Sequence, residues 1–340
     1  MPGGEAPVLS VRDLRTWFRV DDRVARAVDG VSFDVRPGET LGLVGESGCG
    51  KTVTALSLLG LLPPNARVEA GSSILFEGKE ELTRATPERL REIRGGEISM
   101  IFQEPTTSLN PVQTIGDQIA ETVRLHRDVS RREARSEAIR LLGEVGIVEP
   151  DVRVDEYPHR LSGGMRQRAM IAMALSCDPK VLVADEPTTA LDVTIQAQIL
   201  DLLDRLRKRH RMAVLLITHD LGVVAEVCDR VVVMYAGQVV ETGSVFDVFR
   251  GPAHPYTRGL LASLPTVDRP GRRLVPIGGA VPSPFAFATG CRFGDRCPLA
   301  GAECATPQAM VTLGADGRAA RCWRARDLGA EAVAAVGEEP

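Results

Sequence analysis

Hydrophobic and polar residues follow two different patterns along the chain. Short runs of β-branched residues bounded by turn residues occupy positions 8–11, 31–35 and 40–44, which predicts an extended N-terminal β region. From position 115 to about 149 the composition shifts to Ala, Arg, Glu and Leu, and apolar residues recur three and four positions apart. That spacing is typical of an amphipathic helix and predicts a helical insert.

A second alternation of strands and helices follows the insert. Positions 181–184, 214–217 and 230–234 have the composition of buried strands, and positions 193–209 have the pattern of an amphipathic helix. This order favours an α/β fold with a mostly parallel sheet. Prolines become frequent after position 250 and interrupt any long element. We therefore expect a main domain over 1–250 with a helical subdomain at about 105–178, a smaller module over 251–326, and a flexible tail over 327–340.

The composition narrows the classes of protein to which the chain can belong. With 340 residues, 44% of them hydrophobic, and a formal net charge of −4, it is typical of a globular protein with a sizeable core. The slightly acidic balance and the 4% aromatic content argue against nucleic acid as a partner. The N-terminus lacks the pattern of a signal peptide, and no apolar run approaches the roughly 18 residues that cross a membrane. We expect a cytosolic location, in which cysteines stay reduced.

One glycine-rich segment has the spacing of a phosphate-binding loop. It follows the predicted strand at 40–44 and precedes a helical pattern, which is the context that the motif G-x-x-x-x-G-K-[ST] requires. Glycines let backbone N–H groups approach phosphate oxygens, a lysine neutralises their charge, and a threonine can bind Mg²⁺. The cysteine inside the loop is interpreted first as a tolerated small residue, because phosphate binding does not require its side chain, and alternatively as a thiol that makes an ATPase sensitive to thiol reagents. The predicted ATP-binding residues are Gly45, Glu46, Ser47, Gly48, Cys49, Gly50, Lys51 and Thr52.

Two carboxylates follow the buried strand at 181–184. Asp185 and Glu186 come at the carboxyl end of that strand, where α/β sheets bind ligands. Asp185 suits the ligand shell of Mg²⁺, and Glu186 is placed to act as general base on the water that attacks the γ-phosphate.

At this point the chain resembles the ATP-binding cassette (ABC) ATPases, because residues 161–167, LSGGMRQ, are similar to the signature motif of that family. The resemblance implies a RecA-like parallel-sheet core with an N-terminal antiparallel β region and a helical subdomain. It also implies that two cassettes close over two ATP molecules, and it leaves open whether Trp17 or Phe18 stacks on adenine or belongs to the core. The family roles would fall on Gln103 (magnesium and water), His219 (γ-phosphate), the loop at 190–192 (opposite cassette), and Ser162, Gly163, Gly164 and Gln167 (the partner's nucleotide).

Two further motifs indicate a branch of this family. Residues 254–257, HPYT, and residues 157–159, YPH, resemble motifs of the ATPases that energise dipeptide and oligopeptide importers. The resemblance implies a peripheral location on the cytoplasmic face of the membrane and two transmembrane permease subunits. It also implies an extracytoplasmic peptide-binding protein and a second, related ATPase or a second copy of this chain. Nickel or another small solute is an alternative cargo. A soluble ABC ATPase acting on DNA or the ribosome is disfavoured, because the chain has one cassette and no long coiled coil.

Four cysteines near the C-terminus form a separate candidate site. Cys291, Cys297, Cys304 and Cys322 have the spacing C-x5-C-x6-C-x17-C. Four thiolates can hold a [4Fe-4S] cluster or a tetrahedral Zn²⁺. Zinc ribbons usually contain C-x2–4-C pairs, which are missing here, and some peptide-importer ATPases carry a cluster in such a segment. We rank the iron–sulfur cluster first, zinc second and free thiols third.

Overall fold

The computed structural model describes residues 6–104, 108–189, 191–264, 276–314 and 317–329. The chain divides into two compact units, each built from segments that lie far apart in the sequence. The first unit contains Met1–Leu9, Val35–Glu39 and Phe76–Ile217, and the second contains Ser10–Asp34, Thr40–Leu75 and Thr218–Pro340. The residues after 250 therefore group with the N-terminal strands, which gives no support to a separate cysteine-containing module. The division at residue 250 stays a prediction.

The first unit contains three parallel strands. β7 (Ile98–Ile101) pairs with β8 (Val181–Asp185), and β8 pairs with β9 (Ala213–Thr218). All residues of β8 and β9 are buried. Continuous apolar runs of this kind are typical of parallel strands that are covered on both faces. The strands predicted at 181–184 and 214–217 are thus confirmed.

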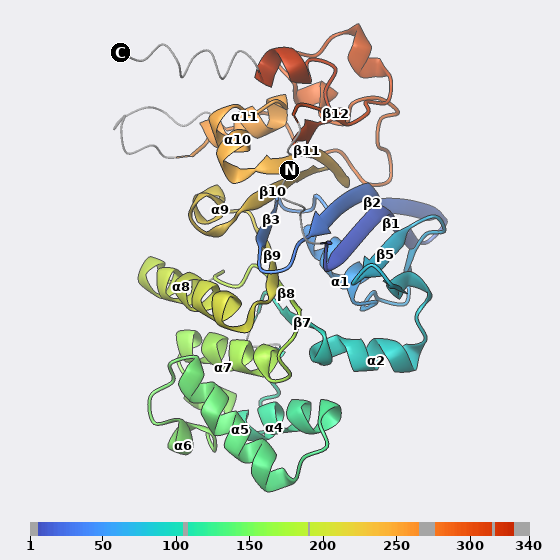
Figure 1. Cartoon of the computed structure of the whole chain (residues 1–340). Coiled ribbons are helices and arrows are strands. Elements are labelled where there is room, and N and C mark those ends of the chain that lie inside the picture. The colour runs from blue at the N-terminus through green and yellow to red at the C-terminus, as the bar shows by residue number, and fades with distance from the viewer. Residues whose placement is uncertain (1–5, 105–107, 190, 265–275, 315–316, 330–340) are drawn as a thin grey trace, which may run out of the picture. The chain divides into compact units, whose positions relative to one another are not determined.

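Most of the remaining elements of the first unit are helices. α4 (Ile115–His126), α5 (Arg131–Glu144) and α7 (Gly163–Leu175) pack against one another, which confirms the predicted helical insert (Figure 1). A Ser130 and Glu133 capping box begins α5, and this box satisfies backbone N–H groups that the helix leaves without partners. The remaining elements are β6 (Glu80–Glu81), η1 (Leu82–Arg84), α2 (Pro87–Gly96), α6 (Pro150–Arg153), η2 (Pro158–Arg160) and α8 (Val193–His210).

The second unit contains parallel and antiparallel strands, so the predicted mostly parallel sheet is only partly confirmed. β3 (Thr40–Val44) is parallel to β10 (Arg230–Tyr235), but β10 is antiparallel to β11 (Gln238–Ser244). The turn between β10 and β11 has positive φ at both Ala236 and Gly237, as a tight hairpin requires. β11 then pairs antiparallel with β13 (Ala319–Ala320), and β13 with β12 (Val311–Thr312).

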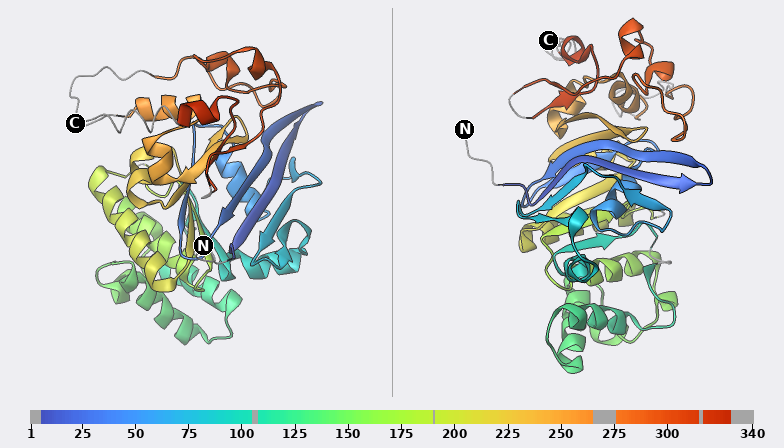
Figure 2. Two further views of the ribbon diagram at one scale, coloured as in Figure 1. Left: turned by 45° about the horizontal axis from the view of Figure 1, so that its top comes forward. Right: turned by 90° about the vertical axis from the view of Figure 1, so that its right-hand side faces the viewer.

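The N-terminal β region is longer than the sequence pattern predicts. β1 (Leu9–Val20) and β2 (Arg23–Val35) are long neighbouring strands (Figure 2). β1 also pairs antiparallel with β4 (Ala66–Val68). The other elements of this unit are α1 (Lys51–Leu58), β5 (Ser73–Phe76), α9 (Leu221–Val227), α10 (Val245–Arg250), α11 (Pro255–Ala262), η3 (Gly294–Arg296) and η4 (Ala302–Ala305). None of the helices in the described parts of either unit is long and apolar enough to cross a membrane.

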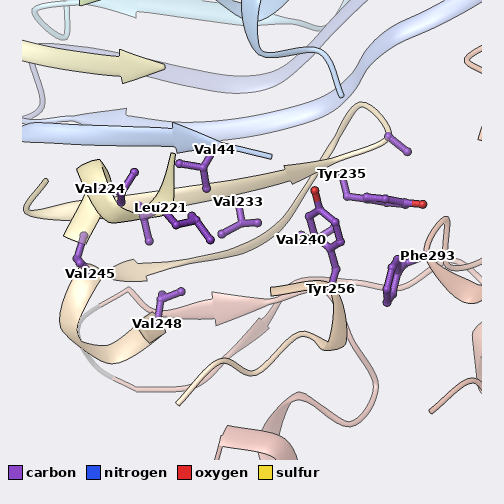
Figure 3. Close-up of a cluster of buried hydrophobic side chains, with 12 residues drawn as sticks. Val44, Leu221, Val224, Val233, Tyr235, Val240, Val245, Val248, Tyr256 and Phe293 are labelled. Carbon is purple, nitrogen blue, oxygen red and sulfur yellow. The ribbon is translucent and has the colours of Figure 1, made fainter. Parts of the chain in front are cut away.

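An aromatic group joins the C-terminal segment to β10 and α11. The ring centroids of Tyr235 and Tyr256 lie 4.6 Å apart, and Phe293 lies 5.3 and 5.4 Å from the two tyrosine rings. The three rings lie at one end of a larger apolar cluster that continues to Val245 and Val248 (Figure 3). Each such aromatic pair adds about 0.5–1.5 kcal/mol beyond the area it buries, so the segment around Phe293 is firmly attached.

A buried histidine begins α11. His254 Nδ1 accepts a hydrogen bond from the backbone N–H of Tyr256, and the backbone N–H groups of Ala253 and His254 donate to the Glu241 carboxylate. Burial lowers the pKa of His254 to about 3, because the imidazolium form would lose its hydration. His254 is therefore neutral in the folded protein at ordinary pH.

The lowered pKa of His254 in the folded protein predicts that the free energy of unfolding depends on pH. Because the pKa of His254 is lowered on folding, the unfolded chain takes up a proton near pH 6.5 that the folded protein does not take up until about pH 3. The contribution of His254 to stability is thus lost as the pH falls, by about 1.4 kcal/mol per pH unit below pH 6.5. The wild type should lose free energy of unfolding between pH 7 and pH 5 that His254→Asn does not lose. In chemical denaturation, the difference in this loss should be roughly 2 kcal/mol. The exposed His159→Asn is the control, and equal pH profiles for His254→Asn and the wild type would contradict the assignment.

Candidate functional site

The loop between β3 and α1 adopts a conformation that only glycine allows at two positions. Gly45 and Gly50 have φ values of +150° and +105°. A Cβ at Gly45 would lie 2.2 Å from the carbonyl oxygen of Met234, and one at Gly50 would lie 2.5 Å from that of Ala27. The loop passes this close to neighbouring backbone and leads directly into the N-terminus of α1, which is the arrangement of an anion-binding loop.

Lys51 is the first residue of α1, and its side chain folds over the loop. The side chain is almost completely buried, and Nζ donates to the carbonyl oxygens of Gly45 at 2.7 Å and Glu46 at 3.1 Å. A phosphate bound by the N–H groups of the loop would meet this ammonium group. Thr52 follows and is exposed, so its hydroxyl is accessible to a metal ion.

The structure favours the interpretation of Cys49 as a tolerated small residue over that of a thiol that reacts readily in the folded protein. The side chain is completely buried, and burial raises the pKa of the thiol. The thiolate is the reactive species, so a buried thiol with a raised pKa reacts slowly. The backbone of Cys49 has a structural role instead, because its carbonyl accepts from the N–H of Gly237 in the β10–β11 turn.

We expect alkylation to reflect this burial. In the native protein, Cys49 should react with iodoacetamide at least about tenfold more slowly than the partly exposed Cys228, as measured by mass spectrometry of peptides. The two rates should become similar in denaturant. Alkylation of Cys49 as fast as that of Cys228 in the native protein would contradict this description of the loop.

The carboxylate side of the candidate site lies at the end of β8. Asp185 is buried, and Glu186 adopts a left-handed backbone conformation with φ of +46°. Such a conformation costs a non-glycine residue about 1 kcal/mol or more and is enriched at functional sites. Glu186 Oε2 accepts from Gln103 Nε2 at 3.0 Å and from Thr189 Oγ1 at 2.9 Å. The carboxylate is thus oriented by donors from two loops.

Thr189 was missed by the sequence analysis. It lies three residues after Glu186 in the same turn, and the turn pattern alone does not indicate where its hydroxyl points. Gln103, by contrast, was predicted to join the magnesium and water site. Its Nε2 atom bonds to Glu186, and the amide still has Oε1, an oxygen of the kind that Mg²⁺ prefers.

The predicted signature residues lie at the N-terminus of α7. Ser162 is the N-cap and accepts from the N–H of Met165 at 3.3 Å, and both Ser162 and Gly163 are exposed. Gly164 packs closely, since a Cβ there would lie 3.1 Å from Ile195. Gln167 differs from the other three because it is only 2% exposed, and its Nε2 atom has no hydrogen-bond partner within the described residues. The predicted contact of Gln167 with a partner's nucleotide stays a prediction, and it would require this buried side chain to become accessible.

The structure describes three other predicted sites without deciding their roles. His219 is exposed between β9 and α9, next to Asp220, whose side chain caps α9. In the loop predicted to touch the opposite cassette, Asp192 caps α8, and residue 190 lies outside the described residues. Trp17 and Phe18 are both half-buried on β1, so the choice of adenine-stacking residue stays open. The phosphate loop and His219 belong to one unit and the carboxylates and signature to the other, and their assembly into one site stays a prediction.

The four C-terminal cysteines line one small pocket. Cys291, Cys297, Cys304 and Cys322 share it with Phe293, Leu299, Trp323 and other residues. No group of three or more His, Cys, Asp or Glu side chains in the described parts of the chain is arranged to hold a metal ion. The thiols as placed therefore do not fit zinc, and neither the structure nor the comparisons below support the predicted iron–sulfur cluster. Burial raises the pKa of Cys322 to about 11, so this thiol is protonated here.

Two family models match the sequence. The model described as "ABC transporter" matches residues 28–189, and the model described as "Oligopeptide/dipeptide transporter, C-terminal region" matches residues 240–304. The first match includes the phosphate loop, the signature segment and both carboxylates. The second begins in β11 and includes the HPYT motif and three of the four cysteines.

Two solved structures show a similar fold. A dimeric bacterial ABC transporter cassette named MJ0796 has a TM-score of 0.62 at 24% identity, covering 70% of this chain and 98% of the cassette. CbiO1 of Clostridium perfringens, part of the ABC transporter complex cbiONQ, has a TM-score of 0.61 at 28% identity, covering 72% of this chain and 91% of CbiO1. The predicted ABC cassette fold is thus confirmed.

Curated relatives match almost the whole chain. A probable peptide ABC transporter ATP-binding protein of Sinorhizobium fredii, y4tR, is 53% identical over 323 residues, which are 94% of this chain and 96% of the relative. The oligopeptide transport ATP-binding protein AppD of Bacillus subtilis is 52% identical over 324 residues, with 95% and 98% coverage. With this identity over this length, and with the cassette fold and both family models in agreement, the chain belongs to the ATP-binding proteins of the peptide ABC transporter family.

Proposed function

We propose that this chain is the motor subunit of an importer for dipeptides or oligopeptides, bound peripherally to the cytoplasmic face of the membrane. The family makes it an ATPase coupled to transport. The observation that carries the peptide cargo is the match to the C-terminal region model of oligopeptide and dipeptide transporters. Relatives with more than 50% identity along nearly the full chain are named for peptide transport, which supports the same cargo.

The residues that would bind and hydrolyse ATP divide into three groups. The loop from Gly45 to Thr52 would bind the phosphates, and the buried ammonium of Lys51 supports this role. Magnesium would be held by Thr52, Gln103 and Asp185 and would neutralise charge on the β- and γ-phosphates. Glu186 would act as general base, which the two hydrogen bonds orienting its carboxylate support, and His219 would contact the γ-phosphate.

A second cassette would complete each site. Ser162, Gly163 and Gly164 would meet the nucleotide bound by the partner, and the exposed N-terminus of the 13-residue helix α7 supports this. The partner would be a second copy of this chain or a related ATPase. Closure of the two cassettes would move two transmembrane permease subunits, and an extracytoplasmic peptide-binding protein would deliver the cargo.

Reconstitution tests the proposed cargo. The chain should be assembled in proteoliposomes with its two permeases, and the binding protein should be added on the side from which cargo is taken up. ATP-dependent uptake should then be measured for di- to hexapeptides and for Ni²⁺. Uptake of peptides that is lost in Glu186→Gln supports the proposal. Uptake of Ni²⁺ but not of peptides would show that the proposed cargo is wrong. A chain that binds DNA or ribosomes and does not associate with permeases would refute the proposed role as an importer subunit.

The iron–sulfur cluster remains a separate proposal. We propose the [4Fe-4S] cluster on the chemistry of the four thiols that line one pocket, although their arrangement in the described residues is not that of a metal site. Anaerobic purification should then yield a brown protein with about four iron and four sulfide per chain, a ratio that Cys297→Ser should reduce. Cys177→Ser, outside the pocket, is the control. A colourless protein with one zinc, or with four reactive thiols, would refute the cluster.

A further inference from the structure

An arginine from the C-terminal segment binds the phosphate loop directly. Arg296 Nη1 and Nη2 donate to the two carboxylate oxygens of Glu46 at 2.7 and 2.9 Å. Glu46 is the second residue of the loop, and 250 residues separate the two partners in the sequence. The side chain of Arg296 is only 5% exposed and that of Glu46 is 30% exposed, so the guanidinium group of this two-point ion pair is shielded from solvent while the carboxylate is partly accessible.

A second contact reaches the same residue. The hydroxyl of the buried Tyr256 accepts a hydrogen bond from the backbone N–H of Glu46 at 2.9 Å. Glu46 is therefore held at both its side chain and its backbone by residues that follow β11. Both holding residues lie outside the cassette segment matched by the ABC transporter model, which ends at residue 189.

The position of Arg296 is itself well fixed. Its Nε donates to the carbonyl of Gly278, Nη2 also reaches the carbonyl of Ile277, and Nη1 reaches the hydroxyl of Tyr235. Phe293, three residues earlier, is buried against Tyr235 and Tyr256. The guanidinium group therefore cannot follow Glu46 freely but presents a fixed positive charge to it.

We propose that Arg296 and Tyr256 are positioning residues for the phosphate loop: they hold Glu46 in place, and Arg296 neutralises a carboxylate that would otherwise repel the phosphates of ATP. A nucleotide carries several negative charges to a loop that already contains one carboxylate. With Arg296 in place, that carboxylate is paired and turned toward the C-terminal segment. Without it, the Glu46 charge remains close to the bound anion. This inference rests on the proposed role of the loop in ATP binding.

A double-mutant cycle tests the charge argument with the purified full chain. The dissociation constants of ADP and of a non-hydrolysable ATP analogue should be measured by calorimetry for Arg296→Gln, Glu46→Gln and the double variant. Arg296→Gln should weaken binding about tenfold, because the Glu46 carboxylate is left without its partner. Adding Glu46→Gln should recover at least threefold of that loss. Equal effects of Glu46→Gln with and without Arg296 would overturn the proposal.

Two further variants separate positioning from folding. Arg318→Gln removes another buried arginine of the same unit, one that faces Glu241 and not the loop. It should lower the midpoint of denaturation without changing nucleotide affinity. Tyr256→Phe keeps the buried ring and removes the acceptor for the Glu46 N–H, and it should weaken binding about threefold. Wild-type affinity in both Arg296→Gln and Tyr256→Phe would overturn the proposal.

Lys51→Met distinguishes failure of this inference from failure of the proposed site. If Lys51→Met still binds nucleotide like the wild type, the phosphate loop is not the ATP site and the proposed function falls with the inference. If Lys51→Met loses binding while Arg296→Gln retains it, only the positioning role is refuted.

Discussion

Glu186→Gln is expected to lower the rate of ATP hydrolysis by about 10²–10⁴-fold while nucleotide binding is retained. The amide keeps the size of the side chain but cannot accept a proton from the attacking water. In the wild type, Gln103 Nε2 and Thr189 Oγ1 both donate to Oε2 of Glu186. In the glutamine variant, an NH₂ group, which cannot accept these hydrogen bonds, replaces one of the two carboxylate oxygens. Steady-state phosphate release and calorimetric titration with ATP measure the two parts of the expectation separately.

Thr189→Val is the matched comparison for this result. It removes the Thr189 hydroxyl that donates to the carboxylate but leaves the carboxylate itself, so hydrolysis should fall by only about three- to tenfold. A Glu186→Gln protein that hydrolyses ATP at the wild-type rate would remove Glu186 from the role of general base. A Thr189→Val protein as inactive as Glu186→Gln would mean that the turn, and not the carboxylate alone, is required.

The strands and helices that were predicted correctly are those with a strong internal pattern. The five consecutive residues VLVAD identify strand β8, and apolar residues three and four positions apart identify the 18-residue helix α8, so each pattern lies within the element itself. The antiparallel β10–β11 hairpin was missed because its turn is Ala236-Gly237, whereas the strong sequence signal for such a turn is Asn-Gly or Asp-Gly. Local patterns thus predicted the parallel strands better than the antiparallel edge.

The phosphate loop could be predicted because its chemistry is contained in eight consecutive residues. The partners that hold it could not. Tyr256 and Arg296 contact Glu46 across 210 and 250 residues, and nothing in the spacing of an arginine and a tyrosine indicates such a contact. The HPYT motif was interpreted only as a mark of the peptide-transport branch. The structure shows its tyrosine bonded to the loop.

This contact also bears on the cysteines. Arg296 directly precedes Cys297, and Phe293 lies between Cys291 and Cys297 and packs on Tyr256. The segment that carries these cysteines therefore also carries Arg296 and packs on Tyr256, the two residues that contact Glu46. The four-cysteine segment and the phosphate loop are connected through side chains of a single unit of the structure.

Lys51→Met should weaken nucleotide binding by about 10²-fold or more, since the charge-assisted contacts of the ammonium with phosphate are lost in a buried place. The Lys51 side chain is almost fully buried, and within the described chain its Nζ atom donates to the backbone carbonyl oxygens of Gly45 and Glu46. These acceptors carry no net charge, whereas a phosphate would add a full opposite charge. Calorimetric titration with ADP and ATP measures the loss, which should be greater for ATP because of its additional phosphate.

The matched control carries the same substitution at a lysine outside the loop. Lys180 forms ion pairs with Glu77 and Glu97 and is about half exposed, so Lys180→Met should cost no more than about 1 kcal/mol of stability and leave nucleotide affinity unchanged. Wild-type affinity in Lys51→Met, or an equal loss in Lys180→Met, would contradict a direct contact between Lys51 and phosphate. Loss confined to Lys51→Met would instead locate the bound phosphates at the loop that Arg296 and Tyr256 hold.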